Sequence, residues 1–113
     1  MIKTTQKIGK VTVVSLQGSL ELSQQEKFKE TLLKQVTGDP CSLVINLKEV
    51  DFIDSTCLGA LIAVARRLRE RGGDVKLSNM TPEVRSIFQI TRLEKVFEIF
   101  EGIDDAVSAY KKA

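Results

Sequence analysis

The side chains best suited to chemistry in this chain lie together in one short turn, residues 51–57. Two carboxylates, two hydroxyls and a thiol occur there, on Asp51, Asp54, Ser55, Thr56 and Cys57. An apolar run precedes the turn and a long amphipathic run follows it, which predicts a buried strand leading into a helix. Open α/β sheets bind ligands and partners at the carboxyl ends of such strands. We therefore take this turn as the candidate functional site.

Ser55 is predicted to be the N-cap of the following helix, because its side-chain oxygen can accept a hydrogen bond from the free N–H of Cys57 or Leu58. It would then also lie at the positive end of the helix dipole, a position that favours a phosphate. Helix caps are common, so these residues alone favour a plain cap over a modified hydroxyl. A modified hydroxyl would have to be accessible to solvent.

The overall composition argues against several classes of protein. Of the 113 residues, 42% are hydrophobic and 28% are charged, as in ordinary globular domains. The formal net charge of +2 is too small to indicate nucleic-acid binding, and no apolar run is long enough to cross a membrane. The first residues lack the apolar core of a signal peptide. We therefore expect a cytoplasmic protein that neither enters a membrane nor binds nucleic acid directly.

Histidine is absent, which removes the commonest metal ligand and the commonest general base. The two cysteines, Cys41 and Cys57, lie in unrelated contexts and are expected to be reduced thiols. So few ligands make a structural zinc site unexpected. The sequence thus predicts neither a metal nor a cofactor.

Strand-like and helix-like patterns alternate along the chain. Strands are predicted at residues 2–8, 10–18, 42–47, 74–78 and 95–100, and helices at 23–36, at 56–71, from 82 and from 104. Strands that alternate with helices form parallel pairs through right-handed crossovers. The predicted fold class is α/β, a single domain with a mixed, mostly parallel central sheet of about five strands packed by about four helices.

Local signals add detail to these elements. The run Ser42 to Leu47 is almost continuously apolar, which predicts an interior strand with both faces covered. Gly72-Gly73 should end the central helix in a left-handed cap, and Thr81 with Pro82 should begin the next one. Ser23 with Glu26 forms a predicted capping box. The side chains predicted to be buried on the first two helices are Phe28, Leu32 and Val36, then Leu58, Leu61, Ile62, Ala65 and Leu68.

Taken together, these features resemble the STAS domain, as found in bacterial anti-sigma factor antagonists. The resemblance rests on motifs that cover nearly the whole chain in the right order: Gly18 with Glu21, Val44-Ile45-Asn46-Leu47, Val50, Phe52-Ile53-Asp54-Ser55, Leu58-Gly59, Gly72-Gly73 and Thr91-x-Leu93. The resemblance implies one STAS domain over residues 1–113.

In that family, the serine after the aspartate is phosphorylated by a partner that is both a serine kinase and an anti-sigma factor, with a histidine-kinase-like ATPase fold. The unphosphorylated protein binds this partner and frees the sigma factor, which regulates transcription, and a separate serine phosphatase reverses the modification. The matching residue here is Ser55, with Thr56 as the less favoured neighbour. The resemblance also implies a protein that is not an enzyme and is a monomer on its own.

The resemblance further implies a partner-binding surface around this serine. It would be formed by Glu21, Asp54, Ser55, Thr56, Cys57, Leu58 and Gly59. Family members usually have glycine at the position of Cys57, so a side chain there could crowd the partner. A thiol at a helix amino terminus could also have a lowered pKa and be reactive. A small buried or half-buried filler is the favoured interpretation of Cys57.

The sequence is also compatible with three other interpretations, of which two are disfavoured. Some STAS domains are subunits of transport or signalling assemblies without sigma-factor control, and this chain could be one. An enzyme is disfavoured, because no phosphate-binding glycine loop and no nucleophile–base pair can be identified. The cluster of Arg66, Arg67, Arg69 and Arg71 could bind nucleic acid, but without interleaved aromatic residues it is better explained as the exposed face of a helix.

Overall fold

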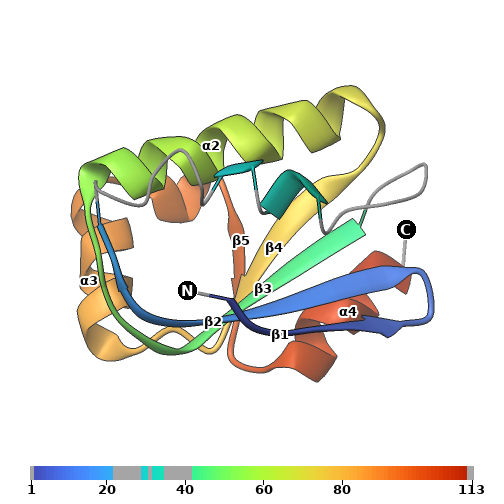
Figure 1. Cartoon of the computed structure of the whole chain (residues 1–113), viewed down its shortest axis with the longest axis horizontal. Coiled ribbons are helices and arrows are strands. Elements are labelled where there is room, and N and C mark those ends of the chain that lie inside the picture. Colours follow the sequence, from blue (N-terminus) through green and yellow to red (C-terminus); the bar gives the residue numbers. More distant parts are fainter. Residues whose placement is uncertain (1, 22–28, 31, 35–41, 112–113) are drawn as a thin grey trace.

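The computed structural model describes residues 2–21, 29–30, 32–34 and 42–111. Five strands form one sheet in the order β1-β2-β3-β4-β5. Their bounds are β1 Ile2–Ile8, β2 Val11–Leu20, β3 Ser42–Ile53, β4 Asp74–Ser78 and β5 Glu98–Phe100. β1 is antiparallel to β2, and all other neighbours are parallel (Figure 1). The predicted mixed, mostly parallel sheet is confirmed.

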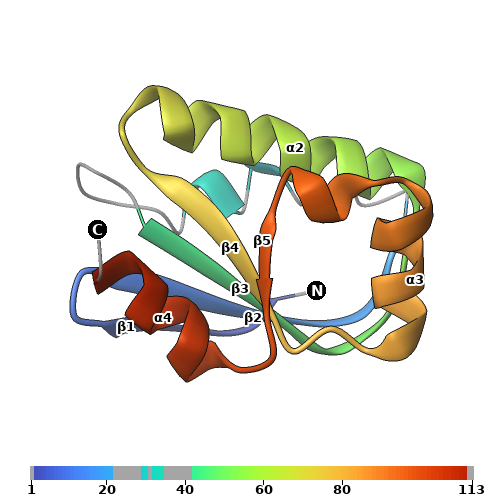
Figure 2. The ribbon, with the colours of Figure 1, turned by 180° about the vertical axis from the view of Figure 1, so that it is seen from behind.

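Helices cover both faces of this sheet. Their bounds are α2 Ser55–Glu70, α3 Pro82–Ile90, the 3-10 turn η2 Leu93–Lys95 and α4 Ile103–Lys111, and residues 29, 30 and 32–34 are also helical. α2 and α3 pack with the larger hydrophobic core on one face, whereas α4 packs over a smaller cluster on the other (Figures 1 and 2). The alternation of strands and helices is as predicted, and the α/β fold class is confirmed.

β3 is the interior strand that the sequence predicts. It pairs with β2 on one side and β4 on the other. Leu43, Ile45 and Leu47 lie in the larger core, and Val44 lies in the cluster under α4. The strand is longer than predicted, because Val50 and Ile53 continue the pairing with β2. The segment 48–53, interpreted from the sequence as a link, is therefore strand.

The central helix ends as predicted. Gly72 has φ +83°, the N–H of Gly73 donates to the carbonyl of Leu68 at 2.8 Å, and that of Gly72 donates to the carbonyl of Arg69 at 3.1 Å. These two bonds form a Schellman cap. Four of the five side chains predicted to be buried on this helix are buried, but Ile62 is only half-buried. Val64 is buried in addition, so the inward face of the helix is turned slightly from the predicted one.

The later elements follow the predicted order with one change of length. The hydroxyl of Thr81 accepts from the N–H of Val84 at 3.3 Å, and Pro82 is the first residue of α3. β5 is shorter than the predicted 95–100, because the chain first forms the turn η2. In the helix predicted from Ser23, Leu32 is fully buried as expected. Ser23, Glu26, Phe28, Val36 and Cys41 lie outside the described residues.

Tyr110 links α4 to the sheet through hydrogen bonds of its hydroxyl. Its hydroxyl lies 2.8 Å from the carbonyl oxygen of Leu43 and 2.6 Å from that of Asp74, and it accepts from the N–H of Leu43 at 3.3 Å. The ammonium of Lys76 lies 4.7 Å from the centre of the tyrosine ring. Burial, together with the nearby carboxylate of Asp74, raises the pKa of Tyr110 above its ordinary range.

This raised pKa predicts a loss of stability in alkali. The folded state holds the phenol proton more tightly than the unfolded state, so the stabilisation is complete below the unfolded pKa of about 10 and is lost as the pH rises through and above it. Tyr110 is the only tyrosine, so phenolate absorbance reports it alone and should appear at higher pH in native than in urea-unfolded protein. Tyr110→Phe should cost about 1 kcal/mol at neutral pH and remove this alkaline loss. Ser108→Ala, an exposed change on the same helix, is the control, and equal titration of native and unfolded protein would contradict the prediction.

Candidate functional site

Asp54, and not Ser55, is the N-cap of α2. Asp54 has extended backbone angles, φ −89° and ψ 170°, and its Oδ1 accepts from the N–H of Cys57 at 2.9 Å. Its N–H donates to the carbonyl of Leu20 at 3.0 Å, which continues the pairing of β2 with β3 up to the helix. Because Asp54 is still held in the extended conformation by this bond, it takes the capping position. The prediction that Ser55 caps the helix is therefore wrong.

Ser55 is the first residue of α2 and is exposed to solvent. The predicted accessibility of its hydroxyl is confirmed. Thr56, the neighbouring hydroxyl, is only half exposed. Since the Asp54 carboxylate satisfies the N–H of Cys57, modification of the Ser55 hydroxyl would not remove the helix cap.

The end of β2 brings further residues to this turn. The hydroxyl of Ser19 donates to the Asp51 carboxylate at 2.9 Å, and the backbone carbonyl of Glu21 accepts from the Cys57 thiol at 3.4 Å. The Glu21 side chain is exposed. Gly18, with φ +83° at an irregularity in the pairing of β2 with β3, adopts a conformation that favours glycine. The structure thus brings Glu21 beside Asp54 and Cys57, residues far apart in sequence.

Cys57 points into the protein and is fully buried. Burial, followed by the charge of Asp54, raises the pKa of the Cys57 thiol to about 11. The lowered pKa considered from the sequence does not occur, because desolvation and the nearby carboxylates of Asp54 and Glu21 raise the pKa of this thiol. The filler interpretation is the one that the structure supports. Cys57 and Leu58, which is 4% exposed, offer almost no side-chain surface to a partner.

Gly59 lies on the outer face of α2. It is exposed, and a Cβ built at this position would meet nothing within 4 Å. Ser55 and Gly59 are four residues apart in the helix and therefore share one face. Of the residues implied by the resemblance, Glu21, Ser55 and Gly59 are exposed, and Asp54 and Thr56 are half exposed.

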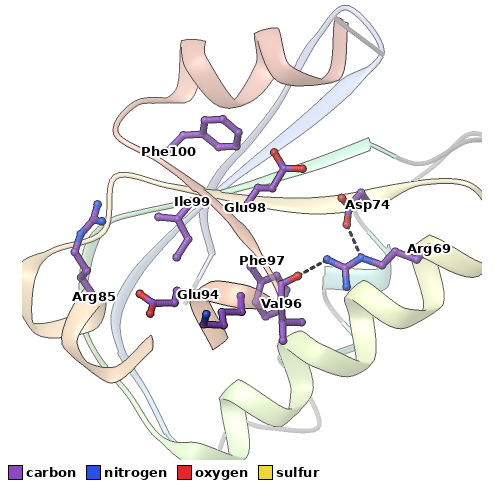
Figure 3. Close-up of a pocket in the computed structure, with 10 residues that line it drawn as sticks. Arg69, Asp74, Arg85, Glu94, Val96, Phe97, Glu98, Ile99 and Phe100 are labelled. Atoms are coloured by element: carbon purple, nitrogen blue, oxygen red, sulfur yellow. Dashed lines mark hydrogen bonds and ion pairs between the residues drawn. The ribbon is translucent and has the colours of Figure 1, made fainter. Parts of the chain in front are cut away.

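Ser55 lies at the exposed surface of the turn. Ser55 does not line the pocket of about 560 Å³ that lies along β5, nor the two smaller pockets beside Arg66 and Lys48. Figure 3 shows that pocket, with the hydrogen bonds from Arg69 to Asp74 and to the backbone of Val96. Within the described ranges of the chain, no group of three potential metal ligands occurs. No helix among them is long and apolar enough to cross a membrane.

Comparison with known proteins gives a consistent result. Residues 3–106 match the family model of the STAS domain. The BtrV protein of Bordetella bronchiseptica, whose name describes it provisionally as an anti-sigma factor antagonist, is 29% identical over 97% of this chain and 95% of its own length. The anti-sigma-B factor antagonist of Bacillus subtilis is 28% identical over 76% of this chain and 78% of its own length.

Solved structures show the same fold. An anti-sigma factor antagonist from Mycobacterium paratuberculosis superposes with a TM-score of 0.83 at 27% identity, over 96% of this chain and 93% of that one. The unphosphorylated form of SpoIIAA superposes with a TM-score of 0.79 at 19% identity, over 100% of this chain and 98% of that one. The phosphorylated form of Bacillus SpoIIAA superposes with a TM-score of 0.67 at 20% identity, over 97% of this chain and 99% of that one. The murine anion transporter Slc26a9 superposes with a TM-score of 0.82 at 20% identity, over 96% of this chain but only 19% of the transporter.

The capping arrangement predicts a difference between two neighbouring positions. Asp54→Ala should lower the free energy of unfolding by about 1 kcal/mol, because the N–H of Cys57 loses its acceptor. Asp54→Asn keeps an acceptor and should be nearly neutral. Ser55→Ala should change stability by less than about 0.5 kcal/mol, as an exposed residue outside the cap does. Urea unfolding of the three variants measures this, and an equal loss for Ser55→Ala would show that Ser55 contributes to the cap.

The raised pKa predicts an inert thiol at Cys57. With a pKa of about 11, only about one molecule in ten thousand carries the reactive thiolate at neutral pH. In a Cys41→Ser background, native protein should react with iodoacetamide far more slowly than urea-unfolded protein, and the rate should rise with pH. Native labelling as fast as that of the unfolded chain would contradict the buried position.

Proposed function

This chain belongs to the STAS domain family, and we propose that it is an anti-sigma factor antagonist switched by phosphorylation of Ser55. In this proposal, the unmodified protein binds an anti-sigma factor that is also a serine kinase with a histidine-kinase-like ATPase fold. Binding frees the sigma factor for transcription. Phosphorylation of Ser55 ends the binding, and a serine phosphatase restores it. Because the proposed partner controls transcription, we propose that this exchange of partners takes place in the bacterial cytoplasm.

The observation that carries the proposal is the position of the Ser55 hydroxyl. It is exposed on the first turn of α2, directly after the capping aspartate, and the cap does not use it. A kinase can therefore reach it without unfolding the turn. Thr56 is less accessible, which favours Ser55 as the acceptor. The names of the relatives supply the class of partner.

The electrostatics of the turn support a switch that acts on the partner more than on the fold. A phosphate adds about −1.5 to −2 charges at neutral pH. The amino terminus of α2 stabilises a negative charge by about 0.3–1 kcal/mol, whereas the carboxylates of Asp54 and Glu21, which both act on the first turn of α2, oppose it. Because these effects have opposite signs, the phosphate need not disturb the fold.

At an interface the same charge has a larger effect, because juxtaposed like charges cost several kcal/mol. A kinase that modifies Ser55 must bring the phosphates of its nucleotide to this hydroxyl. A phosphate already on Ser55 would meet that negative charge. The proposal therefore accounts for loss of binding after modification without a change of structure.

The alternative, a STAS subunit of a transport assembly, rests on the fold alone. The likeness to Slc26a9 is at 20% identity and covers 19% of that transporter. The antagonist relative BtrV instead matches this chain over nearly its whole length. We therefore propose a protein-binding switch, and not an enzyme or a transport subunit.

The proposal predicts opposite effects for two substitutions of Ser55. Ser55→Asp should weaken binding to the purified partner kinase, because it places negative charge at the interface. Ser55→Ala should bind as the unmodified protein does and should not be phosphorylated. Neither change removes the Asp54 cap, so both variants should melt close to the unmodified protein.

Titration calorimetry against the kinase, with a thermal melt of each variant, measures both properties. Ser86→Asp is the matched control, since Ser86 is an exposed serine on a different helix. Its affinity should be unchanged. Equal affinity of the Ser55→Asp and Ser55→Ala variants would contradict the switch.

A further inference from the structure

The outer face of α2 extends from Ser55 far beyond the phosphorylation turn. Ser55, Gly59, Ile62 and Arg66 are spaced by four, three and four residues, so they form one line along the helix. Ser55, Gly59 and Arg66 are exposed, and Ile62 is half-buried. The first part of this line carries only small side chains, so a partner seated on Ser55 can lie close to the helix.

A groove follows on the same side of the helix. It has a volume of about 370 Å³ and is lined by Ile62, Arg66, Arg69, Glu70 and Val96. Val96, which follows the turn η2, is a hydrophobic side chain that remains 41% exposed.

One wall of this groove is held in place. The Arg69 guanidinium donates to Asp74 at 2.7 Å and to the carbonyl of Val96 at 2.8 Å (Figure 3). It also lies 5.8 Å from the centre of the Phe97 ring. The groove is therefore largely pre-formed and could accept one apolar side chain at little conformational cost.

The charge of this part of α2 is positive. Arg66, Arg67 and Arg71 are exposed, and within the described residues none of them forms an ion pair. Arg69, in contrast, is paired with Asp74. Of these arginines, Arg66 lines the groove, together with the carboxylate of Glu70. An unpaired arginine at the edge of a groove with apolar walls complements a negatively charged segment that carries an apolar side chain.

The distance from the phosphorylation turn fits a single interface. Arg66 lies eleven positions after Ser55, which is about 16 Å along a helix. A standard interface buries about 800 Å² on each partner, a patch of roughly 16 Å radius. A partner centred on Ser55 therefore reaches Arg66 at its rim.

We infer that the partner that binds at Ser55 lies along α2 and places an acidic segment with one apolar side chain against Arg66 and the groove between Ile62 and Val96. This inference rests on the proposed function. It adds the direction in which the partner lies and the sign of its charge. A negative partner surface along α2 would attract Arg66 and repel a phosphate on the same line of the helix.

The test measures association and dissociation rates with the purified partner kinase at several salt concentrations. Arg66→Glu should slow association by about tenfold at low salt, with a smaller effect as salt rises, as for a charge at the rim of an interface. Val96→Ser should leave association nearly unchanged and speed dissociation by about threefold or more, because an apolar contact is lost.

Arg67→Glu is the matched control. It makes the same change in net charge one residue along the helix, about 100° away around its axis. It should slow association much less than Arg66→Glu does. Equal slowing by both changes would indicate a general effect of net charge and would overturn the inference. All three side chains are exposed, and thermal melts of the variants check that each is folded.

Two outcomes separate this inference from the proposed function. If Ser55→Asp abolishes binding but Arg66→Glu and Val96→Ser bind as the unmodified protein does, the docking direction is overturned and the switch remains. If Arg66→Glu and Val96→Ser weaken binding but Ser55→Asp does not, the docking surface is supported and the phosphorylation switch is overturned.

Discussion

The hydrogen bond from the Asp54 N–H to the carbonyl of Leu20, at 3.0 Å, determines the geometry of the candidate site. It extends the contact between β2 and β3 to the last residue before the helix. The same residue then begins α2, accepting from the N–H of Cys57 with its side chain and from that of Leu58 with its carbonyl. One residue thus sets where the strand ends and in which direction the helix leaves. Ser55 is at the surface because Asp54 occupies the capping position.

This arrangement separates the residues that hold the turn together from those that a partner can touch. Behind Ser55, the Asp54 cap, the strand pairing and the buried Cys57 form contacts that do not use the Ser55 hydroxyl. In front of it, α2 presents small and basic side chains to solvent. A charge added to the outer layer can therefore change recognition while the inner layer keeps the fold.

Much of the fold follows from patterns that depend on near neighbours in the chain. The apolar run from Ser42 to Leu47 is enough to predict an interior strand, since only a strand covered on both faces is apolar at nearly every position. Gly72-Gly73 and Thr81-Pro82 mark helix ends, because the backbone conformation needed there suits those residue types. The accessibility of Ser55 is expected from the resemblance to a family that modifies this serine, and not from its place in the first turn, where Cys57 is buried.

The sequence by itself determined the α/β class, the order of the elements and the position of the candidate turn between β3 and α2. Tertiary structure decided the choice of Asp54 over Ser55 as cap, because both residue types cap helices well and the end of the pairing with β2 selected between them. It also decided the state of Cys57, whose pKa depends on burial and on carboxylates that include Glu21 from another strand end. Periodicity shows which residues share a face, whereas strand ends, helix rotation and pKa values depend on neighbours that are distant in sequence.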